Sequence, residues 1–297
     1  MRYPLIASLR PNFLLLALLC AGLGIVLTLD QKAVSPLLCL AVLLGALLAH
    51  ASVNLLNEYD DFCTGLDATT ERTPFSGGSG ALPTQPSAAP WVLYAGLGTL
   101  LGAVGIGLYF VWRQGWPLLL LGVLGSGLVL AYTRWLTRSP WLCFMAPGVG
   151  FAIIVVGSVL ALGGQLSATV WWVAGIVMLL CSELLLLNQF PDVDADRLAG
   201  RHHLLIVFGI QRMAGYVIGL WWLVYAAVIV GVISQGLPVA SLSVLLTLPL
   251  MLILQHKLKG TIGMDSPDAI HWSVPLGLNV AALLISLALL LVSLLIG

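Results

Sequence analysis

Long apolar runs alternate with short polar segments along the whole chain. An α-helix of roughly 17–25 apolar residues matches the thickness of a bilayer core. Nine such runs occur, at roughly 12–29, 34–56, 91–112, 116–133, 141–162, 168–190, 213–233, 237–255 and 274–296. The pattern predicts an all-α integral membrane protein with about nine transmembrane helices. We expect residues 1–297 to form a single transmembrane domain.

Composition supports a membrane protein and narrows its partners. Hydrophobic residues make up 60% and charged residues 8% of the chain, which excludes an ordinary soluble domain. The net charge is +0, so no basic excess favours a nucleic-acid partner. We expect the lipid bilayer as the surroundings and no obligate protein partner. The five Cys residues show no metal-type spacing and are expected to be small buried hydrophobic groups.

The basic residues predict how the chain is oriented in the membrane. With the N-terminus in the cytoplasm, all Lys and Arg residues except Lys32 and Arg113 fall on the cytoplasmic side. The protein would then lie in the cell (inner) membrane, with its C-terminus on the outer side. The longest loops, 57–90, 191–212 and 256–273, would all be cytoplasmic. We therefore expect these loops to cap a site that faces the cytoplasm.

Two short acidic windows interrupt the apolar pattern, at 57–67 (N-E-Y-D-D-F-C-T-G-L-D) and 188–196 (N-Q-F-P-D-V-D-A-D). In each, an Asn stands four residues ahead of an Asp, and a further Asp follows. Carboxylates crowded beside a bilayer repel one another and are costly to desolvate, so they need a countercharge. Hard divalent cations bind such oxygen ligands, and Mg²⁺ often shares them with a substrate phosphate. The candidate Mg²⁺ ligands are Asn57, Asp61, Asp67, Asn188, Asp192 and Asp196.

The spacing of the windows suggests an internal repeat. They lie 131 positions apart, counted from Asn57 to Asn188, and each comes at the end of a predicted span. This predicts two four-helix pseudo-repeats plus a ninth helix, with the site between the halves. One window alone could be a solvated helix end. Two matching windows on one membrane face favour a binding site.

Polar residues also extend from each window along a helix face. In the second span His50, Asn54, Asn57 and Asp61 follow at i, i+4, i+7 and i+11, so they share one face. His50 would lie about 10 Å deeper than Asn57 at the helical rise per residue. Beyond the sixth span, Asn188, Asp192 and Asp196 follow at i, i+4 and i+8, although Pro191 can reset that helix.

A glycine-rich loop follows the first window and reads R-T-P-F-S-G-G-S-G from Arg72 to Gly80. Arginine offers planar donors to phosphate oxygens, and glycine-rich backbone exposes N–H groups that can do the same. Alone, this loop could be a flexible connector. Beside a candidate Mg²⁺ cluster it is a candidate diphosphate lid, with Arg201 as the matching cation in the second loop. Arg197 is a second candidate there, but it is explained equally well as a basic residue that anchors the cytoplasmic end of a span.

Three further side chains have two interpretations each. His50 either contacts the acceptor at the pocket floor or hydrogen-bonds a neighbouring helix. Tyr132 either contacts the substrate or is an interfacial aromatic. Glu183 lies within a span but points away from Asn188 and Asp192 on a helical projection, so we favour a paired or protonated structural role.

These motifs resemble the signatures of the UbiA superfamily of intramembrane prenyltransferases. The resemblance rests on N-x-x-x-D…D, R-T-P-F-S-G-G-S-G and N-x-F-x-D-x-x-x-D-x-x-x-G, and it covers roughly residues 50–210. The first window, with Gly65 and Asp67, is most similar to the branch that includes 1,4-dihydroxy-2-naphthoate polyprenyltransferases. Glu58 stands where Asp is usual, and Arg201-His202-His203 replaces the usual Lys-x-Thr. These differences bear on the acceptor more than on the diphosphate.

The resemblance implies Mg²⁺-dependent transfer of a polyprenyl group from polyprenyl diphosphate to a small aromatic acceptor such as 1,4-dihydroxy-2-naphthoate, with release of diphosphate. Hydroxybenzoate, homogentisate, haem or a sugar phosphate are alternative acceptors, and a membrane transporter is an alternative of another class. The residues expected to act in catalysis are Asp61, Asp192, Asp196, Tyr132 and His50. Those expected to bind substrate are Asn54, Asn57, Arg72, Ser76, Arg134, Arg138, Asn188 and Arg201.

Overall fold

The computed structural model describes residues 2–68, 70–265 and 267–297, and the regular elements in these ranges are all helices. The α-helices are α1 (Arg2–Leu9), α2 (Pro11–Leu29), α3 (Pro36–Thr64), α4 (Ala81–Thr84), α5 (Ala89–Gln114), α6 (Trp116–Ala131), α7 (Pro140–Ala161), α8 (Ala168–Asn188), α9 (Val193–Leu198), α10 (Leu204–Phe208), α11 (Ile210–Ile233), α12 (Leu248–Ile262) and α13 (Ala269–Ile296). Short 3-10 helices are η1 (Leu66–Ala68), η2 (Pro86–Ala88), η3 (Leu136–Arg138) and η4 (Val239–Thr247).

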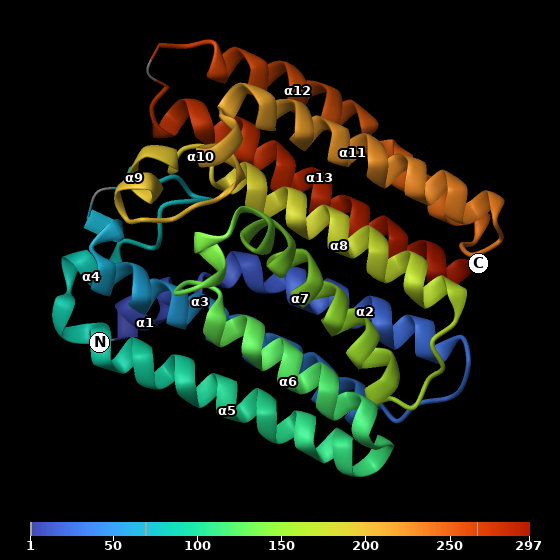
Figure 1. Cartoon of the computed structure of the whole chain (residues 1–297). Coiled ribbons are helices and arrows are strands. Elements are labelled where there is room, and N and C mark those ends of the chain that lie inside the picture. The colour runs from blue at the N-terminus through green and yellow to red at the C-terminus, as the bar shows by residue number, and fades with distance from the viewer. Residues whose placement is uncertain (1, 69, 266) are drawn as a thin grey trace.

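Every predicted span falls on helical structure of the described chain, the eighth on η4 followed by α12. Eight helical segments there are long and apolar enough to cross a bilayer, and α6 is a shorter apolar helix of 16 residues. The long helices pack side by side as one bundle, and the two termini lie at its opposite ends (Figure 1). The prediction of an all-α integral membrane protein is therefore confirmed. A chain that crosses a membrane an odd number of times has its two termini on opposite sides, which agrees with this arrangement.

Proline and glycine set where the helices begin and end. Pro11, Pro36 and Pro140 occupy first-turn positions, where a missing N–H costs nothing. Gly65 ends α3 in the left-handed region, with φ of 77°. The eighth predicted span is not one α-helix, because it starts as η4 and becomes α-helical only at Leu248. Pro249 accounts for this break, since it cannot donate the bond that would continue a preceding α-turn.

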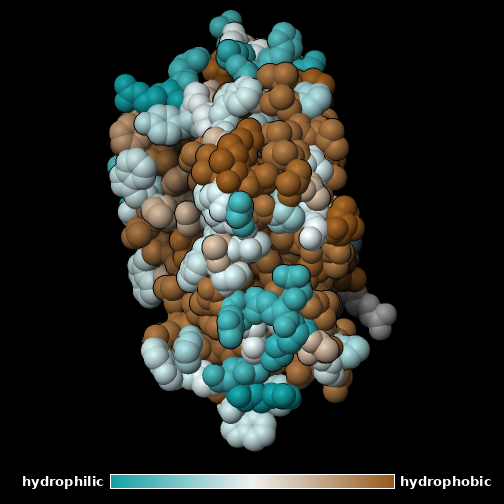
Figure 2. All heavy atoms as spheres, turned by 90° about the vertical axis from the view of Figure 1, so that its right-hand side faces the viewer, coloured by the Kyte–Doolittle hydropathy of each residue, from teal (hydrophilic) through white to brown (hydrophobic). Residues whose placement is uncertain are grey.

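The short elements gather at one end of the bundle. Helices α1, α4, α9 and α10 and the loops between them cover the end where α3 and α8 finish (Figure 1). The opposite end, seen in Figure 2, carries hydrophilic patches between hydrophobic surfaces. Its connections are tied by hydrogen bonds from Gln31 Nε2 to Gln165 O (3.0 Å) and from Lys32 Nζ to Gly163 O (3.2 Å). Both acidic windows thus lie under the covered end.

Helix α8 runs through the most enclosed part of the bundle. Glu183 is fully buried on the side facing α11 and α13, against Trp221 and Asn279. Trp221 Nε1 donates to Asn279 Oδ1 at 2.9 Å. Both carboxyl oxygens of Glu183 are buried without a hydrogen-bond partner among the described residues. Glu183 therefore belongs to the packing of the second half rather than to the acidic windows.

Helices α7 and α8 approach each other closely at Gly148. A Cβ atom there would lie 2.1 Å from Ser182 Oγ and 2.3 Å from the Met178 carbonyl oxygen. Small residues permit such backbone contact between membrane helices. This contact fixes α7, which lines the site, against α8, which carries the second window.

We expect Gly148→Ala to destabilise the protein by about 1–3 kcal/mol, because the added methyl group overpacks a backbone contact. The measurement is thermal unfolding of the detergent-solubilised protein. Gly105→Ala is the matched control, since a Cβ at Gly105 meets no atom within 4 Å. Equal melting temperatures for the two variants would contradict the close contact.

Candidate active site

The first window lies on the last turns of α3. This helix continues to Thr64, so Asn57 and Asp61 stand one turn apart, and Asn57 Nδ2 donates to Asp61 Oδ2 at 2.8 Å. Asn57 Oδ1 accepts a hydrogen bond of 2.9 Å from Thr133 Oγ1, next to Tyr132 after α6. Asn54 Nδ2 donates to the Leu9 carbonyl oxygen at 2.9 Å and ties α1 to α3. The predicted polar face of this helix therefore exists, and it also organises its neighbours.

The second window is not a continuous helical stripe. Helix α8 ends at Asn188, residues 189–192 form a turn, and α9 starts at Val193. Pro191 explains the interruption, because it lacks an N–H and disfavours helical geometry in the residue before it. The expected register of Asn188, Asp192 and Asp196 on one helix face is therefore wrong. Asp196 instead lies within α9 and is buried.

Arg201 joins the two windows. Its Nη1 lies 2.9 Å from Asp196 Oδ1, and its Nη2 forms an ion pair with Asp61 Oδ1. Although burial lowers the pKa of Arg201, Asp61 and Asp196 raise it above its ordinary value. His203 is fully buried and its Nε2 lies 3.0 Å from Asp196 Oδ2. A continuous hydrogen-bonded chain thus crosses the site through His203, Asp196, Arg201, Asp61, Asn57 and Thr133.

Glu58 and Arg10 hold the glycine-rich loop over the first window. The buried Glu58 carboxylate accepts from the backbone N–H of Ser79 at 3.0 Å and also from its hydroxyl group. Arg10 Nη2 donates to the Phe75 carbonyl oxygen at 3.1 Å. Gly78 has φ of 71°, and a Cβ there would lie 2.5 Å from Asp67 Oδ1. The loop backbone consequently lies directly against the first acidic cluster.

Within this loop, Thr73 and Ser76 form a tight turn. The Thr73 hydroxyl accepts from the Ser76 N–H at 2.8 Å, and Thr73 N–H donates to the Ser76 carbonyl oxygen at 3.2 Å. Arg72 Nη2 donates to the Asp67 carbonyl oxygen at 3.0 Å. Gly80 packs against the Arg72 guanidinium, where a Cβ would lie 2.6 Å from its central carbon. Hydrogen bonds within the loop and to Asp67 therefore hold its conformation.

Carboxyl and amide oxygens near the mouth remain available to a ligand. Asp67 Oδ2, Asn188 Oδ1 and Asp192 Oδ1 are buried without a hydrogen-bond partner. Burial raises the pKa of Asp67 to about 7, and the neighbouring carboxylates Glu58 and Asp61 add to this rise. Burial and the nearby Asp196 raise the pKa of Asp192 to about 8. These oxygens fit a hard divalent cation, whose charge would offset the cost of ionising them.

Among the described residues, no three acidic, His or Cys side chains are grouped closely enough to hold a metal ion by themselves. A cation at this mouth would thus need oxygens from another source. A substrate phosphate can supply them, as is usual for Mg²⁺.

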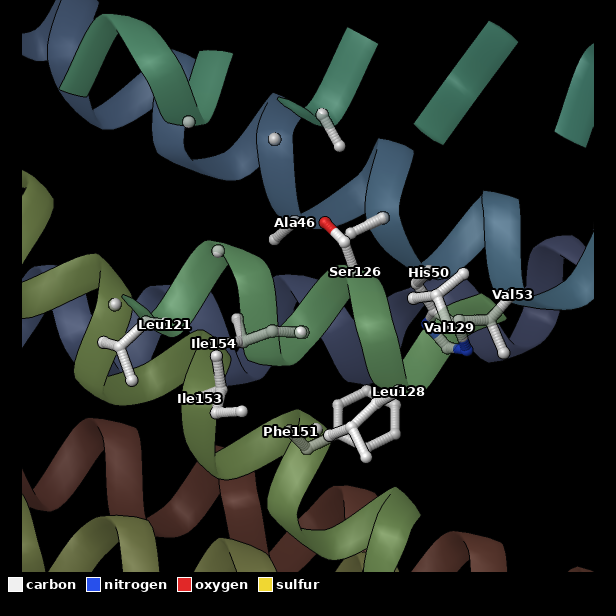
Figure 3. Close-up of a pocket in the computed structure, with 18 of the residues that line it drawn as sticks. Ala46, His50, Val53, Leu121, Ser126, Leu128, Val129, Phe151, Ile153 and Ile154 are labelled. Carbon is white, nitrogen blue, oxygen red and sulfur yellow. The ribbon is translucent and has the colours of Figure 1, made fainter. Parts of the chain in front are cut away.

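A cavity of about 770 Å³ opens below the windows between α2, α3, α5, α6, α7 and α8. Its walls are mainly apolar, and Figure 3 shows His50, Ser126 and Phe151, from α3, α6 and α7, among the residues that line it. His50 packs edge-on against Phe151, with ring centroids 5.2 Å apart, and its Nδ1 is buried without a partner. Polar groups concentrate at the end nearest the windows, namely Arg10, Asn54, Tyr132 and Asn188.

A second cavity of about 410 Å³ is lined mainly by polar residues, among them Arg201 and Asp61. Thr133, Arg134 and Arg138 line it. Arg134 Nη2 is engaged by Asp60 Oδ1 at 2.8 Å, and Asp60 raises the pKa of Arg134, whereas Arg138 is exposed. The two arginines therefore lie outside the apolar cavity.

The contacts by which Arg10, Glu58, Thr133 and His203 hold this site were not predicted. Arg10 precedes the first span and counted there only as a basic residue. Its guanidinium lines the apolar cavity, stacks over Phe13 at 4.7 Å and forms no ion pair with a described carboxylate. Local signals were absent because each of these contacts joins residues from separate helices or loops.

An apolar cavity that ends in carboxylate, amide and guanidinium groups suits a substrate with an oily tail and an anionic head. These features define an intramembrane enzyme for amphipathic substrates. The chain belongs to the UbiA prenyltransferase family, whose model matches residues 14–274. It is therefore a prenyltransferase with multiple membrane-spanning helices, and the resemblance seen in its motifs is confirmed.

Individual relatives agree with this assignment. The chain is 29% identical over 246 residues to the 1,4-dihydroxy-2-naphthoate octaprenyltransferase of Bacillus subtilis (strain 168), covering 79% of this chain and 76% of that protein. The fold matches a UbiA homologue from Aeropyrum pernix K1 with a TM-score of 0.67 and 16% identity, over 95% and 98% of the two chains. It also matches a UbiA homologue from Archaeoglobus fulgidus bound to DMAPP and Mg²⁺, with a TM-score of 0.62 and 13% identity, over 94% and 98%.

Glu58→Ala should loosen the glycine-rich loop, because the half-buried Ser79 donors lose their acceptor at a cost of about 1 kcal/mol. We expect faster amide hydrogen exchange across residues 72–80 while the long helices keep their protection. Glu71→Ala is the control, since Glu71 is exposed in the same loop. Unchanged exchange in Glu58→Ala would mean that Glu58 does not hold the loop.

Proposed function

We propose that this prenyltransferase moves a polyprenyl group from polyprenyl diphosphate to a small aromatic acid, such as 1,4-dihydroxy-2-naphthoate, and that it requires Mg²⁺. The observation that carries the proposal is the meeting of two oxygen-rich windows at the mouth of one apolar cavity. Support comes from the Bacillus subtilis relative and from the Archaeoglobus fulgidus homologues bound to DMAPP or GPP together with Mg²⁺.

In this proposal the diphosphate lies between the two windows. Asp67, Asn188 and Asp192 supply free oxygens for Mg²⁺, and the diphosphate supplies others. Asp61 and Asp196 can join them once released from Arg201, and Asn57 once released from Asp61 and Thr133. Bound Mg²⁺ would supply positive charge that stabilises the departing diphosphate. Arg72, Arg201 and the loop around Ser76 add hydrogen-bond donors from above.

The transfer itself needs little covalent help from the protein. The bond between the prenyl carbon and the diphosphate oxygen breaks, and its electron pair leaves with the diphosphate. The acceptor ring supplies the pair for the new bond and then loses the proton of the substituted ring carbon, which the released diphosphate can accept. Tyr132 lies at the boundary between head and tail, where its ring can face the developing allylic cation. The apolar walls keep water away from that cation.

Arg10 is the group that we assign to the acceptor carboxylate. Burial lowers its pKa despite the acidic residues of both windows, so the charged guanidinium is not fully compensated. It adopts a left-handed conformation, with φ of 49° and ψ of 63°, which is uncommon for a residue other than glycine and clusters at functional positions. An acceptor carboxylate beside Arg10 would bring the ring near Asn54 and His50, which line the same cavity.

We also infer that the site faces the cytoplasm of the cell (inner) membrane, with the N-terminus on that side and the C-terminus outside. The basis is the concentration of basic residues in the loops at the covered end. The polar cavity lined by Arg134 and Arg138 would then be open to the cytoplasm and could admit a water-soluble acceptor.

Asp61→Ala and Asp192→Ala should each reduce Mg²⁺-dependent diphosphate release by about a hundredfold or more, because each removes charge that holds the metal and the leaving group. The assay is release of diphosphate from membranes given a prenyl diphosphate and the aromatic acid. Asp194→Ala is the control, since Asp194 is exposed in the same window. Near-normal turnover in either test variant would overturn the site assignment.

Arg10→Ala should lower kcat/KM for the aromatic acid by about tenfold to a hundredfold, the value of a charged hydrogen bond. The KM for prenyl diphosphate should change much less. The diagnostic measurement compares the acid with the same ring lacking the carboxylate, because only the wild type should prefer the acid. Arg212→Ala, at an exposed position on α11, is the control. If Arg10→Ala keeps the wild-type preference, Arg10 does not bind the carboxylate.

A further inference from the structure

Glycines on α7 leave open space in the wall of the large cavity. Gly150 and Gly157 both line it, and a Cβ added at either position would meet no atom within 4 Å. They are seven residues apart, so they lie on the same face of α7 and about 10 Å apart along its axis. Gly150 adjoins Phe151, whose ring contacts His50, so it lies at the depth of that histidine. Gly157 lies deeper, towards the end of the bundle away from the acidic windows.

Polar atoms independently indicate where a ligand's head belongs. Asn188 Oδ1 and His50 Nδ1, both on residues that line the cavity, are buried without hydrogen-bond partners. Beyond His50 the lining is mainly apolar: Val42, Phe110, Leu118 and Ala161 form its far part, and Ser158 there donates to the Ile154 carbonyl oxygen of its own helix. An amphipathic ligand would therefore enter this space tail first and pass Gly150 before Gly157.

Other glycines of the bundle also have space for a Cβ atom but do not line the cavity. Gly98 and Gly105 on α5 are also seven residues apart, and a Cβ on either would also meet nothing within 4 Å. They do not line the cavity and are exposed on the outer surface of the bundle. The chain thus offers a matched pair of glycines on a lipid-facing surface.

We propose that Gly150 and Gly157 determine the length of prenyl tail that the cavity accepts, by leaving the channel along α7 unobstructed at two successive depths. This inference rests on the proposed function. A side chain at Gly157 would occupy space that only the later isoprene units of a long tail reach. A side chain at Gly150 would block the channel near His50, where a short tail also passes.

The experiment measures kcat/KM for geranyl, farnesyl and octaprenyl diphosphate with one saturating aromatic acid. In Gly157→Leu, the ratio of octaprenyl to geranyl efficiency should fall about tenfold or more, as overpacking of an apolar site predicts. In Gly150→Leu the efficiency should fall for geranyl and octaprenyl diphosphate alike. Gly98→Leu and Gly105→Leu should keep the wild-type ratio and the wild-type efficiency.

If Gly157→Leu does not fold, Gly157→Val and Gly157→Ala take its place. The ratio of octaprenyl to geranyl efficiency should then fall more for Val than for Ala, because the Val side chain is larger. A wild-type ratio in all folded Gly157 variants would overturn the inference, as would the same loss for every tail length. Absence of prenyl transfer by the wild type with any donor would instead overturn the proposed function. The two failures are therefore distinguishable.

Discussion

The bundle has to keep several carboxylates together at the edge of a membrane, where ionised groups are poorly solvated. Arg201 meets this requirement by pairing with Asp61 from the first window and Asp196 from the second. His203 and Asn57 supply further hydrogen bonds to the same two carboxylates. Because a buried charge without a partner is costly, the end of α3 and the α9 segment must stay close together. The mouth of the cavity takes its shape from this cross-link.

The halves of the bundle use their interiors differently. Around α8, α11, α12 and α13, large side chains such as Trp221 and Met251 are fully buried in one continuous core. Around α3, α5, α6 and α7, glycines and small residues leave the large cavity open. The tightly packed half supports α7, because Gly148 of α7 is in direct contact with α8. The bundle therefore has one densely packed region and one hollow region.

The glycine-rich loop connects the polar mouth to the rest of the cap. Glu58 binds it from below, and Arg10 binds it from the start of α2. Its backbone near Gly77 and Gly78 then faces Asp192 and Asp67, one carboxylate from each window. Under the proposed function, a loop held in this way would present N–H groups to the diphosphate without a large entropic cost on binding. The hydrogen bonds from Ser79 to the Glu58 carboxylate explain what Glu58 does at a position where Asp is usual in the family.

Much of this molecule follows from the sequence alone. Nine apolar runs determine the helices, because a bilayer leaves the backbone few other ways to satisfy its hydrogen bonds. The face shared by His50, Asn54, Asn57 and Asp61 follows from helical periodicity. The register of the second window could not be predicted in the same way, because the helix is interrupted by a turn at Pro191 that helical periodicity does not describe. The ion pairs of Arg201 and the position of Arg10 were decided only by tertiary structure, since they join groups from separate segments whose distances are set by packing.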